Sequence, residues 1–145
     1  MKQYSENVNK ALNFAYGAHH GQLDKSGVAY IYHPAYLASQ MDTEDEIMAA
    51  LLHDVIEDTE ATLEDLEAEG FPAAVIEAVA LLTHDKGTDF FDYVQNLKGN
   101  DIARKVKLAD LSHNSNASRN KALPEDMAKR LRERYAKARQ MLASD

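Results

Sequence analysis

The residues of this chain that could do chemistry are concentrated in the stretch LLHDVIEDT, where His53 and Asp54 are adjacent. An imidazole nitrogen and a carboxylate oxygen together suit a divalent cation of intermediate softness, such as manganese, iron, nickel or zinc. Such a cation lowers the pKa of a bound water and supplies a nucleophile near neutral pH. The pair therefore predicts a metal site suited to the hydrolysis of phosphate esters.

Helical spacing of about 100° per residue separates apolar from acidic side chains over residues 47–58. Asp54, Glu57 and Asp58 fall together on the side opposite the apolar stripe. Three carboxylates at i, i+3 and i+4 repel one another, and a bound cation would offset that repulsion. The alternative is an acidic face exposed to solvent, because most runs of charged residues lie on the surface. The neighbouring His53 favours a metal site instead.

A further candidate carboxylate, Asp110, lies in the segment 102–114. Helical periodicity places it on one stripe with Lys107 and Asn114, although periodicity alone does not separate a ligand from a surface aspartate. His113 falls on the apolar face of the same segment. We therefore expect His113 to be a hydrogen-bonded core histidine.

The other histidines outside the His-Asp pair have ordinary structural explanations when each is taken alone. His84 lies in the turn-like sequence THDKG and is predicted to be exposed to solvent. His19 and His20 end the first predicted helix, where the helix dipole favours a partly cationic imidazole. His33 precedes a proline and is equally unremarkable by itself.

Apolar positions recur at helical spacing in nearly every segment, so the predicted fold class is all-α. Ser5 is the expected N-cap of the first helix, whose stripe includes Val8, Leu12 and Ala15. Thr43 and Glu46 form a capping-box pattern at the start of the helix that carries the His-Asp pair. The other predicted helices cover residues 34–41, a short segment after Thr62, a segment from about residue 73 to Lys86-Gly87, and residues 89–97, 101–116 and 123–142.

Length and composition predict one domain over residues 1–145, with a core that needs no disulfides. The absence of cysteine excludes thiolate metal sites and fits a cytoplasmic location. The longest apolar run, residues 47–52, is too short to cross a membrane. A net charge of −8 disfavours a nucleic acid polymer as a partner, and nothing in the sequence fixes the oligomeric state.

Four segments, read together, resemble the HD-superfamily hydrolase domain of the RelA/SpoT type. They are AHHGQLDKSGVAYIYHP, LLHDVIEDT, VKLAD and the HN that follows, in the family's order and rough spacing. The resemblance covers roughly residues 8–114 and is strongest to the small stand-alone alarmone hydrolases, which lack the synthetase domain. It implies a compact multi-helix HD-domain bundle.

The resemblance also implies roles for individual residues. One divalent metal ion, typically Mn²⁺ in the family, would be bound by His33, His53, Asp54 and Asp110. Glu57 and Asp58 match the acidic pair that positions or deprotonates the attacking water. Lys25, Ser26 and Asn114 match positions that contact the nucleotide. The implied reaction releases pyrophosphate from the 3′ position of guanosine 3′,5′-bis(diphosphate), ppGpp.

The chain departs from the family pattern where the nucleotide is recognised. Asp24 stands where the family usually has an arginine, so both the stacking surface and the charge of a guanidinium are lost. The run 111–116 also differs from the family's basic residue and Leu-His-Asn-Met-Arg. The metal ligands are untouched, so the sequence predicts a metal-dependent phosphohydrolase acting on ppGpp or a related nucleotide. Hydrolysis of another nucleotide or small phosphate ester is the alternative.

Two alternatives outside catalysis make different predictions. A noncatalytic nucleotide sensor would be expected to lack Glu57 or Asp58, and both are present. A purely structural helical domain would bind no metal tightly. The sequence therefore favours an enzyme, while its exact substrate and native metal stay open.

Overall fold

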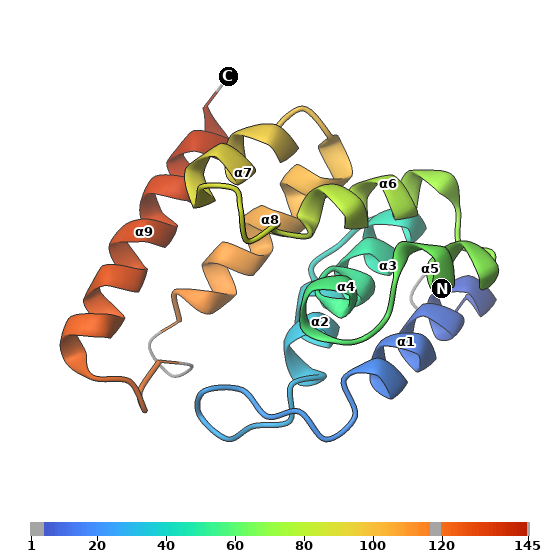
Figure 1. Cartoon of the computed structure of the whole chain (residues 1–145), viewed down its shortest axis with the longest axis horizontal. Coiled ribbons are helices and arrows are strands. Elements are labelled where there is room, and N and C mark those ends of the chain that lie inside the picture. Colours follow the sequence, from blue (N-terminus) through green and yellow to red (C-terminus); the bar gives the residue numbers. More distant parts are fainter. Residues whose placement is uncertain (1–4, 117–119, 145) are drawn as a thin grey trace.

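The regular elements of the protein are helices, which confirms the predicted all-α class (Figure 1). The computed structural model describes residues 5–116 and 120–144. None of the helices in these two ranges is long and apolar enough to cross a membrane. The helices are α1 (Glu6–Ala18), α2 (Tyr32–Ser39), α3 (Glu44–Leu52), α4 (Val55–Asp58), α5 (Leu63–Ala68), α6 (Ala73–Leu82), α7 (Phe90–Leu97), α8 (Asp101–Asn114) and α9 (Glu125–Ala143).

Helix α3 lies at the centre of the fold and packs against α1, α2, α6 and α8. Its last six residues, 47–52, are all buried, so the helix is covered on every side rather than along one stripe. The predicted capping box at its start is present, with the Thr43 side chain accepting from the backbone N–H of Glu46. The fold therefore holds the C-terminal end of α3, where the His-Asp pair follows, inside the core.

The first helix agrees with its prediction at the cap but not along its whole apolar stripe. Ser5 is the N-cap and its side chain accepts from the backbone N–H of Val8. The buried residues are Val8, Ala11 and Ala15, whereas Leu12 is 38% exposed. The prediction for Leu12 was wrong, because the small Ala11 rather than the larger leucine is fully buried on this helix.

The continuous helix expected through residues 47–58 is broken at His53 and Asp54. Helix α3 ends at Leu52 and α4 begins at Val55, while Asp54 has φ −108° and ψ 0°. The Nδ1–H of His53 donates to the carbonyl oxygen of Ala50 over 2.7 Å. In a continuing helix that oxygen would pair with the backbone N–H of Asp54. The side chain of His53 thus competes with the helix at the point where the helix stops.

Other helix ends lie close to the predictions, with one clear exception. Helix α6 ends at Leu82 rather than near Lys86, because the Thr83 hydroxyl donates to the Val79 carbonyl and Thr83 itself has extended backbone angles. Asp89 is the N-cap of α7 and accepts from two backbone N–H groups. Helix α9 packs on α7 and α8, on the opposite side of the molecule from α1 (Figure 1).

An ion pair joins α8 to the start of α3, the two elements that position most of the candidate ligands. Lys105 on α8 contacts Glu46 on α3 over 2.9 Å and also pairs with Asp42 just before that helix. The contact lies on the surface, so its own contribution to stability is small. The ion pair nonetheless links α8 to the start of α3.

The Leu52→Ala substitution tests the central position of α3. Leu52 is fully buried, so removing its side chain should lower the free energy of unfolding by about 2–5 kcal/mol. Leu12→Ala is the matched control, and its 38% exposed side chain should cost clearly less. Urea denaturation followed by circular dichroism measures both values. Equal losses in the two variants would contradict this description of the core.

Candidate metal centre and its cavity

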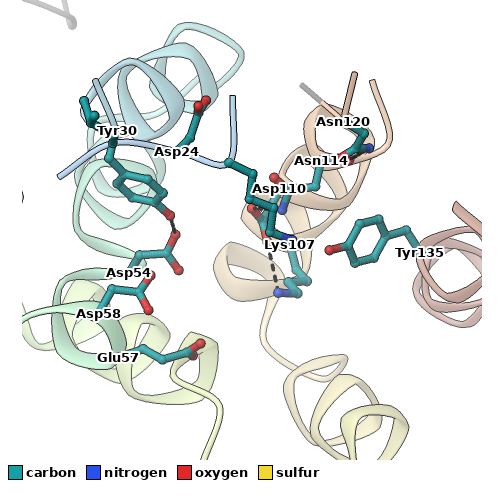
Figure 2. Close-up of a pocket in the computed structure, with 12 residues that line it drawn as sticks. Asp24, Tyr30, Asp54, Glu57, Asp58, Lys107, Asp110, Asn114, Asn120 and Tyr135 are labelled. Carbon is teal, nitrogen blue, oxygen red and sulfur yellow. Dashed lines mark hydrogen bonds and ion pairs between the residues drawn. The ribbon is translucent and has the colours of Figure 1, made fainter. Parts of the chain in front are cut away.

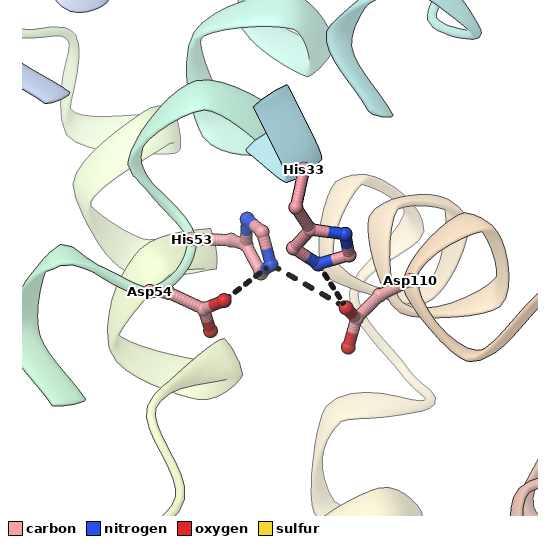
Figure 3. Close-up of side chains that lie close together, drawn as sticks. All are labelled: His33, His53, Asp54 and Asp110. Atoms are coloured by element: carbon pink, nitrogen blue, oxygen red, sulfur yellow. Dashed lines mark hydrogen bonds and ion pairs between the residues drawn. The ribbon is translucent and has the colours of Figure 1, made fainter. Parts of the chain in front are cut away.

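Four side chains from three parts of the chain meet in the core. His33 comes from α2, His53 and Asp54 from the turn between α3 and α4, and Asp110 from α8. One nitrogen or oxygen atom of each lies within 4.8 Å of the corresponding atoms of the other three (Figure 3). The structure thus brings together the four residues that the family resemblance groups as ligands.

The orientation of the His53 ring is fixed from one side. Because Nδ1–H donates to the Ala50 carbonyl, the lone pair of a neutral His53 lies on Nε2. Nε2 is buried, 2.9 Å from Asp54 and 3.5 Å from Asp110, without hydrogen-bond geometry to any described group. A lone pair facing two carboxylates is unfavourable unless a cation or proton lies between them. The donor set of two imidazoles and two carboxylates fits a divalent transition metal.

The charges in the cluster lead to the same conclusion. Burial lowers the pKa of His53, but the carboxylates of Asp54 and Asp110 together outweigh burial and raise that pKa well above its ordinary value. Burial likewise raises the pKa of Asp54, yet the charge and hydrogen bond of His53, with the hydrogen bond from Tyr30, outweigh burial and hold the Asp54 pKa at about 2. The cluster therefore favours ionised carboxylates around a positive charge, which a proton or a metal cation can provide.

Asp110 is held by two residues of its own helix. Lys107 donates to Oδ2 over 2.9 Å, and the side-chain amide of Asn114 donates to Oδ1 over 3.0 Å. Burial raises the pKa of Asp110, but the ammonium of Lys107 together with the imidazoles of His33 and His53 outweighs burial and keeps that pKa well below its usual range. The stripe of three polar residues predicted on α8 is therefore one hydrogen-bonded group facing the cluster.

Tyr30 also belongs to this site, although no argument from the sequence identified it. Its hydroxyl donates to Oδ2 of Asp54. Burial and then the charge of Asp54 raise the pKa of Tyr30, so the phenol keeps its proton and remains a donor. The available signal was its place in YIYHP, three residues before His33. Tyr30 therefore restrains the partly buried Asp54 from the loop before α2.

The two remaining carboxylates of LLHDVIEDT lie on α4. Oε1 of Glu57 accepts from the backbone N–H of His84 over 2.7 Å, which ties Glu57 to the segment after α6. Partial desolvation, followed by the charges of Asp54 and Glu57, raises the pKa of the solvent-accessible Asp58 to about 6. Asp58 is therefore mostly ionised at neutral pH yet can accept a proton readily.

A cavity of about 420 Å³ opens onto the cluster. Asp54, Glu57 and Asp58 lie on one side of it, and residues of α8 and α9 lie on the other (Figure 2). Of the three residues predicted to contact a nucleotide, Lys25 and Asn114 line the cavity and Ser26 does not. The lining comprises Leu23, Asp24, Lys25, Tyr30, Asp54, Glu57, Asp58, Lys107, Asp110, Asn114, Asn120 and Tyr135.

Asp24 has a structural role that accounts for a carboxylate at this position. Its Oδ1 accepts from the backbone N–H groups of Ser26 and Val28, over 2.8 and 3.0 Å. These bonds close the loop between α1 and α2, an interaction that an arginine cannot make because it has no acceptor. Asp24 also lines the cavity, so its negative charge is part of the surface that a ligand would meet.

The structure corrects two of the expectations for the other histidines. His84 is half-buried rather than exposed, since its Nε2 bonds the Thr88 carbonyl over 2.6 Å and its ring stacks on Tyr93. His19 is only 2% exposed, and burial lowers its pKa, which contradicts the expected partial charge. His113 is half-buried and hydrogen-bonded to His33, so its expected hydrogen bond is present.

The raised pKa of Asp58 predicts a pH-dependent effect on the stability of the metal-free protein. A folded-state pKa of about 6, above the ordinary 3.8, means that the folded state gains stability from protonation and loses it as pH rises through 6. Asp58→Asn should therefore be more stable than the wild type at pH 8 and no more stable below about pH 4. Thermal unfolding across this range in EDTA measures the difference, with the exposed Glu60→Gln as control. A stability difference that does not change with pH would contradict the assignment.

The comparisons with known proteins find sequence likeness that reaches 74% of the chain in one relative. No family model matches. A guanosine-3′,5′-bis(diphosphate) 3′-pyrophosphohydrolase of Spiroplasma citri is 44% identical over 64 residues, 41% of this chain and 8% of the relative. The bifunctional (p)ppGpp synthase/hydrolase SpoT of Escherichia coli is 36% identical over 121 residues, 74% of this chain and 17% of the relative. The hydrolase MESH1 of Danio rerio is 41% identical over 85 residues, 53% of this chain and 47% of the relative.

A solved structure gives the same result in three dimensions. It is described as a metazoan orthologue of SpoT that hydrolyses ppGpp and plays a role in starvation responses. It matches this chain with a TM-score of 0.78 and 27% identity, covering 97% of this chain and 87% of its own. The chain spans less than half the length of the three sequence relatives, from 8% to 47%. Because it shares sequence with these relatives and its fold with this structure, the chain belongs to the SpoT/RelA-type hydrolase domains of the HD superfamily.

Proposed function

We propose that this protein is a metal-dependent phosphohydrolase that releases pyrophosphate from the 3′ position of ppGpp or a closely related nucleotide. The observation that carries the proposal is the cluster of two imidazoles and two carboxylates beside a cavity with further acidic and basic side chains. Proteins that are similar to this chain in sequence and structure are named for the same reaction.

The proposed metal site uses His33, His53, Asp54 and Asp110, and the proposed ion is Mn²⁺. The fit rests on the buried Nε2 of His53, which faces two carboxylates without a hydrogen bond to the described residues. When bound, such an ion offsets charge on phosphoryl oxygens and lowers the pKa of water. Tyr30 and Lys107 would hold the two carboxylates in place through their own hydrogen bonds.

Glu57 and Asp58 have different proposed roles because their surroundings differ. Glu57 is fixed by the backbone N–H of His84 and would orient the attacking water. Asp58, with its pKa raised to about 6, would accept the proton that this water loses. A proton acceptor is most effective when its pKa lies near the working pH, and Asp58 meets this condition better than an ordinary aspartate.

Substrate binding in an acidic protein requires local positive charge. Lys107 lies in the wall of the cavity and Lys25 also lines it, so both can offset phosphate charge. Asn114 adds a polar group beside Asp110. Asp24 favours the second candidate, a different nucleotide or small phosphate ester, because its carboxylate lines the space where the family usually offers an arginine. A cytoplasmic location remains a prediction from the sequence.

Substitutions at Asp54 and Asp58 should separate metal binding from proton transfer. Asp54→Ala should abolish tight Mn²⁺ binding, measured by elemental analysis after dialysis, and hydrolysis with it. Asp58→Asn should retain the metal and lower kcat by about 10²–10⁴-fold, the usual range for loss of a general base. Glu60→Gln, an exposed carboxylate two residues further on, should change neither value. Loss of metal in the Asp58 variant would overturn this division of roles.

The substrate itself is tested by a panel of phosphorylated nucleotides assayed with Mn²⁺. Pyrophosphate release from ppGpp should be the fastest reaction, and EDTA should stop it. The panel should include pppGpp, GDP, GTP, ATP and a nucleoside 3′-monophosphate, with pyrophosphate and phosphate measured separately. Faster cleavage of another compound would leave a phosphohydrolase with a different substrate. No turnover of any compound, with nucleotide binding retained, would favour a noncatalytic sensor.

A further inference from the structure

His113 lies outside the proposed ligand set but contacts one of its members. Its Nδ1 is 2.7 Å from the Nδ1 of His33, and the two ring planes differ by only 6°. At this distance the two nitrogens share one hydrogen bond, so one carries the proton and the other accepts it. The positions of the protons on the two rings are therefore linked.

The second nitrogen of His33 faces the cluster. Nε2 lies 2.8 Å from Oδ1 of Asp110, and a neutral imidazole carries only one hydrogen. If that hydrogen is on Nε2, it bonds to Asp110 and leaves no lone pair for a metal. If it is on Nδ1, it bonds to His113 and the Nε2 lone pair faces the cluster. The tautomer of His33 thus decides whether this residue can be a ligand.

The two proposed histidine ligands obtain their orientation by different means. The Nδ1–H of His53 bonds to the backbone carbonyl of Ala50, a group that can only accept. His33 instead meets another imidazole, which accepts at Nδ1 only when its own hydrogen is on Nε2. The imidazole of His113 can therefore support either tautomer of His33. Only the His113 tautomer that carries its hydrogen on Nε2 leaves the Nε2 lone pair of His33 available to a metal.

The position of the His113 ring is restrained from a second helix. The ring of Tyr36, on α2, stacks on it with centroids 4.3 Å apart and planes 28° apart. Tyr36 follows His33 by three residues, slightly less than one turn of α2, so α2 supplies both the proposed ligand and the ring that stacks on His113. These contacts hold the Nδ1 of His113 against that of His33.

We propose that His113 is a positioning residue whose Nδ1 accepts the Nδ1–H of His33 and thereby directs the Nε2 lone pair of His33 toward the bound metal. This inference rests on the proposed function, because it takes His33 to be one of the metal ligands. Second-layer hydrogen bonds of this kind fix the tautomer of a ligating histidine and increase its basicity.

Mn²⁺ titration of the whole chain, followed by electron paramagnetic resonance of the free ion, tests the inference. His113→Leu fills the space without offering an acceptor and should weaken Mn²⁺ binding by about 10–100-fold. His113→Asn places an amide oxygen near the position of Nδ1 and should restore the affinity to within a few-fold of wild type. His20→Asn changes an exposed histidine whose ring packs edge-on against Tyr16, and this variant should bind Mn²⁺ as the wild type does.

The possible outcomes separate this inference from the proposed function. Absence of Mn²⁺ binding by the wild type would overturn both. Equal affinity in the wild type and His113→Leu would overturn the role of His113 alone. Equal weakening by leucine and asparagine would also overturn it, because the bulk of the ring rather than its acceptor would then matter.

A second measurement uses the unaltered protein and does not depend on the folding of any variant. Nitrogen-15 spectra of the histidine side chains, recorded with Zn²⁺ as a diamagnetic metal, report which nitrogen of each ring carries hydrogen. His33 should carry it on Nδ1 and His113 on Nε2. Hydrogen on Nδ1 of His113 in the metal-bound protein would contradict the proposal.

Discussion

The site depends first on the hydrogen bond from the side chain of His53 to the carbonyl of Ala50. This bond lies where α3 ends, and it leaves Nε2 facing the carboxylates of Asp54 and Asp110. The same break gives Asp54 a non-helical backbone, so that it meets the cluster while Glu57 and Asp58 continue on a separate short helix. One local hydrogen bond therefore accompanies both the end of α3 and the placement of His53 and Asp54 in the cluster.

The rest of the fold holds the side chains of this centre in place beside the cavity. The buried end of α3 cannot shift without disturbing the core, and α2 and α8 bring His33 and Asp110 from either side. Carboxylates predominate near the cluster in a chain whose net charge is −8, and Lys107 is the basic side chain bonded directly to Asp110. This excess of negative charge favours a cation between the four side chains. It also leaves the negative charge of Asp58 without a direct basic partner, among the residues that the structure describes, to offset it.

Local rules predicted the elements better than they predicted the details of the site. Ser5 and Thr43 cap helices as expected, because capping depends on residues three positions apart. The break after Leu52 was missed because a helical wheel assumes an unbroken backbone. Tyr30 could not be placed because its partner, Asp54, lies 24 residues further along the chain. His84 could not be placed because its ring stacks on Tyr93 of α7, a contact that local sequence does not reveal. The ligand set came from the family resemblance, which supplies the long-range grouping that periodicity lacks.

The most direct test of the account is a crystal structure of the protein grown with Mn²⁺, with anomalous diffraction used to locate the ion. The account predicts one strong peak bonded to the Nε2 atoms of His33 and His53 and to carboxylate oxygens of Asp54 and Asp110. A fully occupied ion elsewhere, or His33 still bonded through Nε2 to Asp110 with no ion between the four side chains, would contradict it.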